Sequence, residues 1–240
     1  MDQLFHFDTS STAVMLTNSS ALAVSKVNGN PFNCSIQLQN MYQDISELSL
    51  ETVEMPFGAY NIRSPFDTFT LDSNTYPLLD GNYDINTLIS NLNALSSNTF
   101  AIQFPTNKIQ ITGSATTVSA PPNSLLNLLG FTDGQTFSAG KVTATNSFVF
   151  PFDRYVSIWI ENIGPSSEEP QKITYKVPVN GAVGNVIYWD ENSQFYQNIK
   201  VTDRNARVDR LNITVYDRFG NPMNNNGLDW SFSLNVKSDN

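Results

Sequence analysis

Few side chains in this sequence could carry acid–base or nucleophilic chemistry. There is one histidine, His6, and one cysteine, Cys34. His6 falls in a polar N-terminal stretch, which is a poor place to hold a general base in position. Cys34 begins a predicted strand and has no second histidine to activate it, so we interpret it as a small buried side chain. The sequence therefore indicates no Ser-His-Asp or Cys-His catalytic site.

Carboxylates are the second candidate chemistry. Asp80 with Asp84, or Asp190 with Glu191, could act as the two acids of a glycosidase, but spacing alone does not place both acids in one cleft. Four aspartates in or near turns could offer oxygen ligands to Ca²⁺, although capping of the turn is their ordinary role. These four are Asp203, Asp209, Asp217 and Asp229. We name no catalytic, cofactor-binding or metal-binding residue, and we expect no cofactor.

Aromatic residues could form a platform on which sugars stack. The candidates are Trp159, Tyr188, Trp189, Tyr196 and Trp230. Because Trp159 and Trp230 lie inside alternating strands, we favour packing in the core for both. A receptor- or glycan-binding module with Trp189 in the contact stays open as an alternative.

The composition excludes several classes of protein. A net charge of -9 and a pI near 4.4 argue against a phosphate-binding surface, so we expect no direct contact with nucleic acid. Charged residues are only 15% of the 240, which favours large polar interfaces over a freely diffusing enzyme with a substrate. Since no signal peptide or membrane-spanning run is visible, we expect a soluble product made inside a cell.

The elements that would position these residues are strands, with one exception. In residues 76–145 we predict an insert made of a helix, a hairpin and a short helix. Asp84 can cap a helix with apolar residues at the spacing of one buried face, and Pro105 to Asn107 can form the turn of the hairpin. Gly130 stands where the left-handed residue that ends the short helix belongs.

The rest of the chain reads as an all-β domain. Residues 1–31 are rich in Ser, Thr and Asn, and we interpret them as an extended arm. Residues 32–240, apart from the insert, contain about eight alternating segments separated by turn signals, which is typical of a single jelly-roll β-sandwich. The strongest alternation runs from Tyr155 to Ile163.

Three stretches resemble a known family. Residues 45–62, ISELSLETVEMPFGAYNI, resemble a stretch of the penton-type minor capsid proteins of virophages, polintons and large eukaryotic double-stranded DNA viruses, with Ala59 in place of the usual tryptophan. Residues 211–222, LNITVYDRFGNP, which lead into residues 226–234, are similar to the closing strands of those proteins. The insert also resembles theirs, with Gly81 to Tyr83 opening the helix and Leu128 to Phe131 closing the unit.

This resemblance implies a structural function. It implies a single jelly roll that forms a homopentamer at the fivefold vertex of an icosahedral capsid, beside trimers of a double-jelly-roll major capsid protein. Internal minor capsid proteins or a vertex fibre are further partners that it suggests. It carries over no catalytic residue, and it places the protein in the virion after synthesis in the host cytoplasm. Another minor capsid component, or a receptor- or glycan-binding fibre head, is the alternative, and a glycoside hydrolase has the least support.

Overall fold

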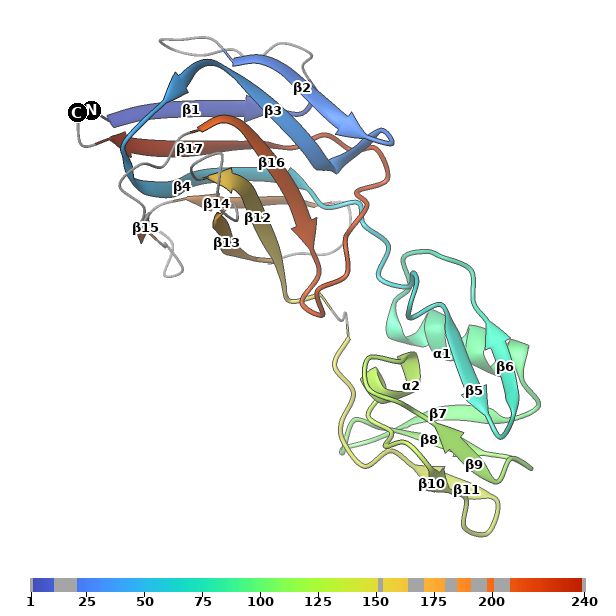
Figure 1. The fold of residues 1–240 in the computed structure, drawn as a ribbon. Coiled ribbons are helices and arrows are strands. Elements are labelled where there is room, and N and C mark those ends of the chain that lie inside the picture. The colour runs from blue at the N-terminus through green and yellow to red at the C-terminus, as the bar shows by residue number, and fades with distance from the viewer. Residues whose placement is uncertain are drawn as a thin grey trace. The chain divides into compact units, whose positions relative to one another are not determined.

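The computed structural model of the chain describes residues 2–10, 21–150, 153–163, 171–179, 185–190, 198–200 and 208–238 (Figure 1). The chain divides into two compact units. One unit combines Met1–Ala59 with Arg154–Asn240 and is called the sandwich here. The other, Tyr60–Asp153, is called the inserted unit. No helix in the described residues is both long enough and apolar enough to cross a membrane.

The sandwich consists of two antiparallel sheets of five strands each. The first sheet has the order β1-β17-β4-β14, with β15 on the same edge of β4 as β14; its strands are β1 (Asp2–Asp8), β17 (Ser231–Ser238), β4 (Ile45–Pro56), β14 (Val186–Asp190) and β15 (Asn198–Lys200). The second has the order β13-β12-β16-β3-β2; its strands are β13 (Gln171–Pro178), β12 (Tyr155–Ile163), β16 (Val208–Tyr216), β3 (Asn30–Tyr42) and β2 (Ala21–Val27).

This strand order is that of a single jelly roll. Of the eight strands β1, β3, β4, β12, β13, β14, β16 and β17, those of the first sheet are β1, β4, β14 and β17, so the chain changes sheet at every step except from β12 to β13. The prediction of an all-β sandwich is confirmed. The described residues hold ten strands in the sandwich rather than about eight, because β2 extends one sheet edge and β14 and β15 occupy one edge of β4 in turn.

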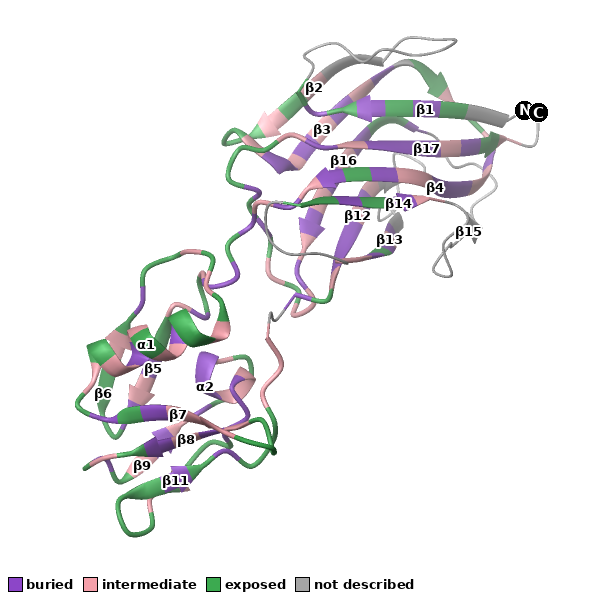
Figure 2. Ribbon diagram, turned by 180° about the vertical axis from the view of Figure 1, so that it is seen from behind, coloured by how far each residue is buried: buried purple, intermediate pink, exposed green. Residues whose placement is uncertain are grey.

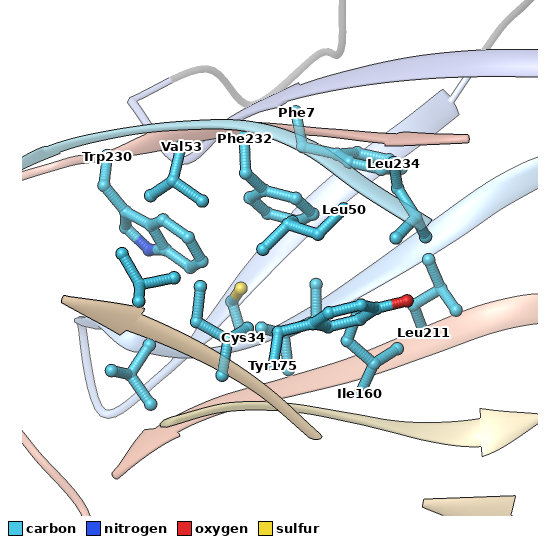
Figure 3. Close-up of a cluster of buried hydrophobic side chains, with 14 of the residues drawn as sticks. Phe7, Cys34, Leu50, Val53, Ile160, Tyr175, Leu211, Trp230, Phe232 and Leu234 are labelled. Carbon is cyan, nitrogen blue, oxygen red and sulfur yellow. The ribbon is translucent and has the colours of Figure 1, made fainter. Parts of the chain in front are cut away.

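Alternating side chains build the core between the two sheets. Phe7, Leu50 and Phe232 face Cys34 and Tyr175 across the interior (Figure 3). Burial follows the period of two over residues 211–216 of β16, whereas the alternation is interrupted in β4 and β17, whose pairing contains register shifts (Figure 2). The indole N–H of Trp230 donates to the backbone oxygen of Pro31 at 2.7 Å, so this buried side chain satisfies its one polar atom.

The expectation of an extended arm over residues 1–31 is wrong for its described parts. β1 pairs with β17 from Asp2↔Lys237 to Asp8↔Ser231, and Phe5 and Phe7 are buried in the core. β2 pairs with β3, and the turn between them is Asn28-Gly29 with φ of 52° and 72°. Two positive φ values are what a two-residue hairpin turn requires, so the strand pair is encoded locally. Residues 11–20 lie outside the described residues.

The inserted unit is larger than the predicted insert over residues 76–145. It contains a four-stranded sheet, β10-β9-β5-β6, and a three-stranded sheet, β11-β8-β7. The first comprises β5 (Thr68–Leu71), β6 (Asn74–Pro77), β9 (Thr117–Ser119) and β10 (Gln135–Thr136), and the second β7 (Thr99–Gln103), β8 (Lys108–Thr112) and β11 (Lys141–Thr143). A helix–hairpin–helix description is therefore incomplete. Most residues of the short strands β5 and β6 precede residue 76. Their sequence there alternates in the same way as that of the sandwich strands.

Both helices of the inserted unit begin and end where the sequence predicts. In α1 (Ile85–Leu95), the Asp84 side chain accepts hydrogen bonds from the backbone N–H groups of Asn86 and Thr87, which satisfies two free donors of the first turn. α2 (Leu125–Leu128) ends at Gly130, whose φ is 95°. The N–H of Phe131 donates to the carbonyl of Leu126 at 3.0 Å, so the short helix closes with the paired bonds of a Schellman motif.

An ion pair joins the two ends of the inserted unit. The guanidinium of Arg63 donates to both carboxylate oxygens of Asp153, at 2.9 and 3.3 Å, and also to the carbonyl of Tyr60. The Asp153 side chain is only 4% exposed and that of Arg63 only 12%. The first and last residues of the unit are therefore linked within the unit itself.

A second polar contact holds the β5–β6 turn against β9. Asp72 accepts from the hydroxyl of Thr116 at 2.6 Å and from the N–H groups of Thr116 and Thr117, each at 2.9 Å. These hydrogen bonds, the Thr116 hydroxyl first, lower the pKa of Asp72 from 3.8 to about 2.

We expect this contact to make the inserted unit acid-sensitive in one pH window. Because the pKa of Asp72 is lower in the folded than in the unfolded chain, the stability that its carboxylate contributes is full above about pH 4 and is lost as the pH falls toward 2. The Asp72→Asn variant should lack this part of the pH dependence in thermal melts between pH 6 and 2. Asp80→Asn, at an exposed position of the same unit, is the control and should melt like the wild type at each pH. Equal pH dependence in the wild type and in Asp72→Asn would contradict the assignment.

Candidate functional site

A hollow of about 340 Å³ lies on the solvent side of the first sheet. Four strands supply its polar lining: His6 and Asp8 from β1, Ser231 and Ser233 from β17, Thr52 and Glu54 from β4, and Tyr188 from β14. The register explains why they meet, because Asp8 pairs with Ser231, Ser231 with Glu54, and Glu54 with Tyr188. Each of these residues alternates with a core residue, so its side chain points away from the core.

A chain of hydrogen bonds crosses three strands at the base of this hollow. The hydroxyl of Thr52 donates to the Ser233 oxygen at 2.7 Å, and that oxygen lies 2.5 Å from Nδ1 of His6. Such cross-strand polar pairs add to the stability of a sheet. His6 is therefore part of strand β1 and not of an extended arm. Its ring makes a polar contact between β1 and β17.

This Ser-His contact does not form a nucleophilic site. Ser233 is 2% exposed, and its oxygen already accepts a hydrogen bond from Thr52. A nucleophile must reach a substrate carbon, and the Ser233 hydroxyl, although it borders the hollow, is almost completely covered and is hydrogen-bonded to both neighbouring strands. The geometry supports a structural role for both residues.

Cys34 is buried in the core between the sheets, as expected for a small apolar side chain. Burial raises the pKa of the Cys34 thiol from 9.0 to about 12, and nearby Lys26 lowers it only in part.

We therefore expect Cys34 to resist thiol reagents in the folded protein. At pH 8, an aromatic disulfide reagent should label less than about one tenth of the thiol within an hour, because the thiolate is the reacting species and its population is very small. Full labelling should follow within minutes once guanidinium chloride unfolds the chain. Rapid labelling of the native protein would contradict burial of this side chain.

The carboxylates considered for glycosidase chemistry have other functions or separate locations. Asp84 caps α1, and hydrogen bonds from the backbone and hydroxyl of Thr87 lower its pKa. Asp80 is exposed in the inserted unit. Asp190 ends β14 in the sandwich, and Glu191 lies outside the described residues. The Asp84 carboxylate is therefore already used to cap the first turn of α1.

The turn aspartates act as caps and ion-pair partners. Asp217 accepts from the backbone N–H groups of Phe219 and Asn221, which is an Asx turn. Asp229 accepts from the ammonium of Lys26. Asp209 is exposed, and Asp203 lies outside the described residues. Within the described part of the chain, no group of three or more potential ligands is arranged to hold a metal ion.

The aromatic candidates divide between the core and the surface. Trp230 and Trp189 are buried, at 2% and 5% exposure, so the predicted contact through Trp189 is wrong. Trp159 was expected in the core but lies on the outer side of β12, against Tyr216, with ring centroids 3.9 Å apart and the ring planes tilted by 35°. Tyr188 is 66% exposed beside the hollow, and Tyr196 lies outside the described residues.

A junction of buried hydrogen bonds forms where β4 leaves the sandwich. Asn225 accepts from the N–H of Gly58 at 2.8 Å and donates to the carbonyls of Pro56 and Leu228 at 2.8 and 2.9 Å. Asn226 donates to the carbonyl of Gly58 at 2.7 Å. A Cβ at Gly58 would lie 2.4 Å from Cδ1 of Leu228 and 3.2 Å from the backbone oxygen of Asn225, so a larger residue there would force the Leu228 side chain to move. The loop before β17 thus fixes the end of β4.

This junction connects the first two stretches of family resemblance. Residues 45–62 cover β4, and the second stretch covers most of β16, the turn after it and the start of β17, with Asn225 in the short gap between its two parts. They lie far apart in sequence, but β4 and β17 are hydrogen-bonded neighbours from Ser231↔Glu54 to Ser238↔Ile45. Sequence reasoning identified both stretches but not their contact, for which the only local signal was the Asn-rich loop itself.

Strand order and sheet pairing define the class of protein as a single jelly-roll β-sandwich with a folded unit between β4 and β12. A crystal structure of the penton protein of mavirus is similar to this chain, with 14% sequence identity, coverage of 98% of this chain and 99% of that chain, and a TM-score of 0.45. No protein-family model and no curated protein matches the sequence.

Proposed function

We propose that this chain is a structural subunit of the fivefold vertex of an icosahedral DNA virus capsid, a penton protein. The observation that carries the proposal is the junction at Asn225. Two penton-like stretches that are distant in sequence form neighbouring strands, and Asn225, which lies in the gap within the second stretch, hydrogen-bonds to Pro56 and Gly58 of the first and to Leu228 of the second. If the similarities were due to chance, we would not expect residues of both stretches to meet in one hydrogen-bonded contact of the folded chain.

The side chains that could have carried chemistry support a structural protein. Cys34 is buried in the core, Asp84 caps a helix, Asp217 closes a turn and Ser233 lies under a cross-strand contact. We therefore propose that the chain has no enzymatic activity and takes no cofactor. Its function would be to present surfaces to neighbours in the capsid.

The partners follow from a vertex position. Identical subunits around a fivefold axis need a heterologous interface that closes into a ring. We propose a homopentamer, with trimers of a double-jelly-roll major capsid protein around it, in a virion whose components are made in the host cytoplasm. Internal minor capsid proteins or a fibre are further candidates for contact with the pentamer.

Native mass spectrometry of the purified full chain, over a range of concentrations, tests the proposal. A pentamer, populated increasingly as the concentration rises, is the expected result. A stable trimer would favour a fibre head instead, and a monomer at the highest concentration would overturn the vertex function of the isolated protein.

One observation favours a second candidate, a glycan-binding module. Tyr188 is 66% exposed at the edge of the hollow, near the carboxylate residues Asp8 and Glu54. An aromatic face beside hydrogen-bonding groups is a common arrangement for a small polar ligand. Binding of the isolated protein to a glycan array, lost in the Tyr188→Ala variant, would support this function. Equal binding by the wild type and the variant would exclude the hollow as the glycan site.

A further inference from the structure

The two outer faces of the sandwich differ in chemistry. On the first sheet, the acidic hollow is the depression lined by Asp8, Glu54 and Tyr188 with the hydroxyl residues beneath them. Among the described residues that line it, Asp8 and Glu54 are acidic, and none is a lysine or an arginine. The acidic hollow therefore presents negative charge next to an exposed aromatic ring.

The second sheet presents the opposite combination on its outer side. The lysine–aromatic patch consists of Lys176 from β13, Tyr155 and Trp159 from β12, and Tyr216 from β16. The ammonium of Lys176 lies 5.0 Å from the centre of the Tyr155 ring, and the Trp159 ring packs against that of Tyr216. Ser157 pairs with both Lys176 and Tyr216, so the patch is contiguous across three strands.

The charge of Lys176 is available for a partner. The side chain is exposed, and it belongs to neither of the two ion pairs of the described residues, Lys26–Asp229 and Arg63–Asp153. The acidic residues of the neighbouring strands lie away from it, since Glu161 pairs with Asn212, four residues along β12 from the rung that holds Lys176. Arg210 is already bound to Gln37 at 3.0 Å.

We propose that the lysine–aromatic patch of one copy docks onto the acidic hollow of the next copy. This inference rests on the proposed vertex function and names the interface that builds the ring. A lysine that enters a hollow lined by two carboxylates and an exposed tyrosine gains both a charge pair and a cation–π contact. Trp159 and Tyr216 supply the aromatic contact area that is typical of interface centres.

The position of the two surfaces allows this contact to repeat from copy to copy. They belong to different sheets and face away from the common core, so a copy that receives a neighbour at its acidic hollow still offers its lysine–aromatic patch to another. Such a heterologous contact continues from copy to copy, and it forms the ring of the proposed vertex when the rotation between successive copies is one fifth of a turn. Two acidic hollows facing each other would instead bring like charges together, which disfavours a twofold dimer through this face.

A charge swap across the interface tests the proposal with the full-length chain. Lys176→Glu and Glu54→Lys should each weaken assembly at least about tenfold, measured as the concentration at which half of the subunits are in the ring by native mass spectrometry. The double variant should recover most of the wild-type assembly, because the charges are exchanged and not removed. Lys141→Glu, at an exposed position of β11 in the inserted unit, is the matched control and should assemble like the wild type.

The outcomes separate this interface from the vertex function on which it rests. Circular dichroism melts of each variant must show the wild-type transition, since both positions are exposed and outside the core. A wild-type pentamer that neither reversal weakens, or a double variant no better than the single ones, overturns the interface but leaves the vertex function intact. A wild-type chain that is monomeric at every concentration overturns both.

Discussion

Replacing Arg63 with alanine is expected to destabilise the inserted unit by about 3 kcal/mol, because it leaves the Asp153 carboxylate buried without its cation. It also removes the hydrogen bond that the guanidinium donates to the Tyr60 carbonyl. The two ends of the unit would lose their only described ion pair, and fraying should begin there. Differential scanning calorimetry of the full chain should show one lowered transition and one unchanged transition.

The control for Arg63→Ala is a substitution of another cation in the inserted unit. Lys141→Ala removes an exposed cation of the same unit and should leave both transitions within about 0.5 kcal/mol of the wild type. Asp153→Asn keeps the shape of the side chain and should have a smaller effect than Asp153→Ala. If Arg63→Ala lowered the transition of the sandwich and not that of the inserted unit, the Arg63–Asp153 ion pair would not stabilise the inserted unit as described.

The Asn225→Ala variant should destabilise the sandwich by about 2 kcal/mol. The amide side chain satisfies the Gly58 N–H and the carbonyls of Pro56 and Leu228, and alanine leaves these groups without it. Equilibrium unfolding in urea, followed by tryptophan fluorescence, measures the change because Trp230 lies in the core of the same unit. Asn224→Ala, at an exposed neighbouring position, is the control. An equal loss in both variants would assign the effect to the loop in general and not to the buried junction.

Local signals in the sequence predicted much of the fold. Asp84 and Gly130 marked the ends of the two helices correctly, because capping depends on the residue itself and on its nearest backbone groups. The alternation from Tyr155 to Ile163 likewise predicted β12 with its bounds. These features need no knowledge of the rest of the chain.

The first strands were missed for a different physical reason. β1 has only two inward-facing aromatic residues, Phe5 and Phe7, and its partner β17 lies at the other end of the sequence. A run this short gives a weak periodic signal until the partner is known. The hairpin of β2 and β3 did carry a usable signal, the Asn28-Gly29 pair, which was outweighed by the Ser- and Thr-rich composition around it.

The candidate surfaces could be predicted only in part. Tyr188 and Trp189 are adjacent in sequence, and which of the two faces solvent depends on the register of β14 on β4. A shift of one residue would exchange them. The contact between His6 and Ser233 joins residues 227 positions apart, so it follows from sheet pairing and not from any motif.

The place of β17 in the first sheet has a consequence for the order of events during synthesis. β17 lies between β1 and β4 and hydrogen-bonds to both, yet it is translated after every other described strand. Until it emerges from the ribosome, β1 and the facing edge of β4 have unpaired backbone groups and no strand between them. Long-range pairing of this kind delays folding and leaves edges open to aggregation. A nascent chain therefore cannot complete its acidic hollow, and subunits interrupted before β17 would be excluded from assembly at this face.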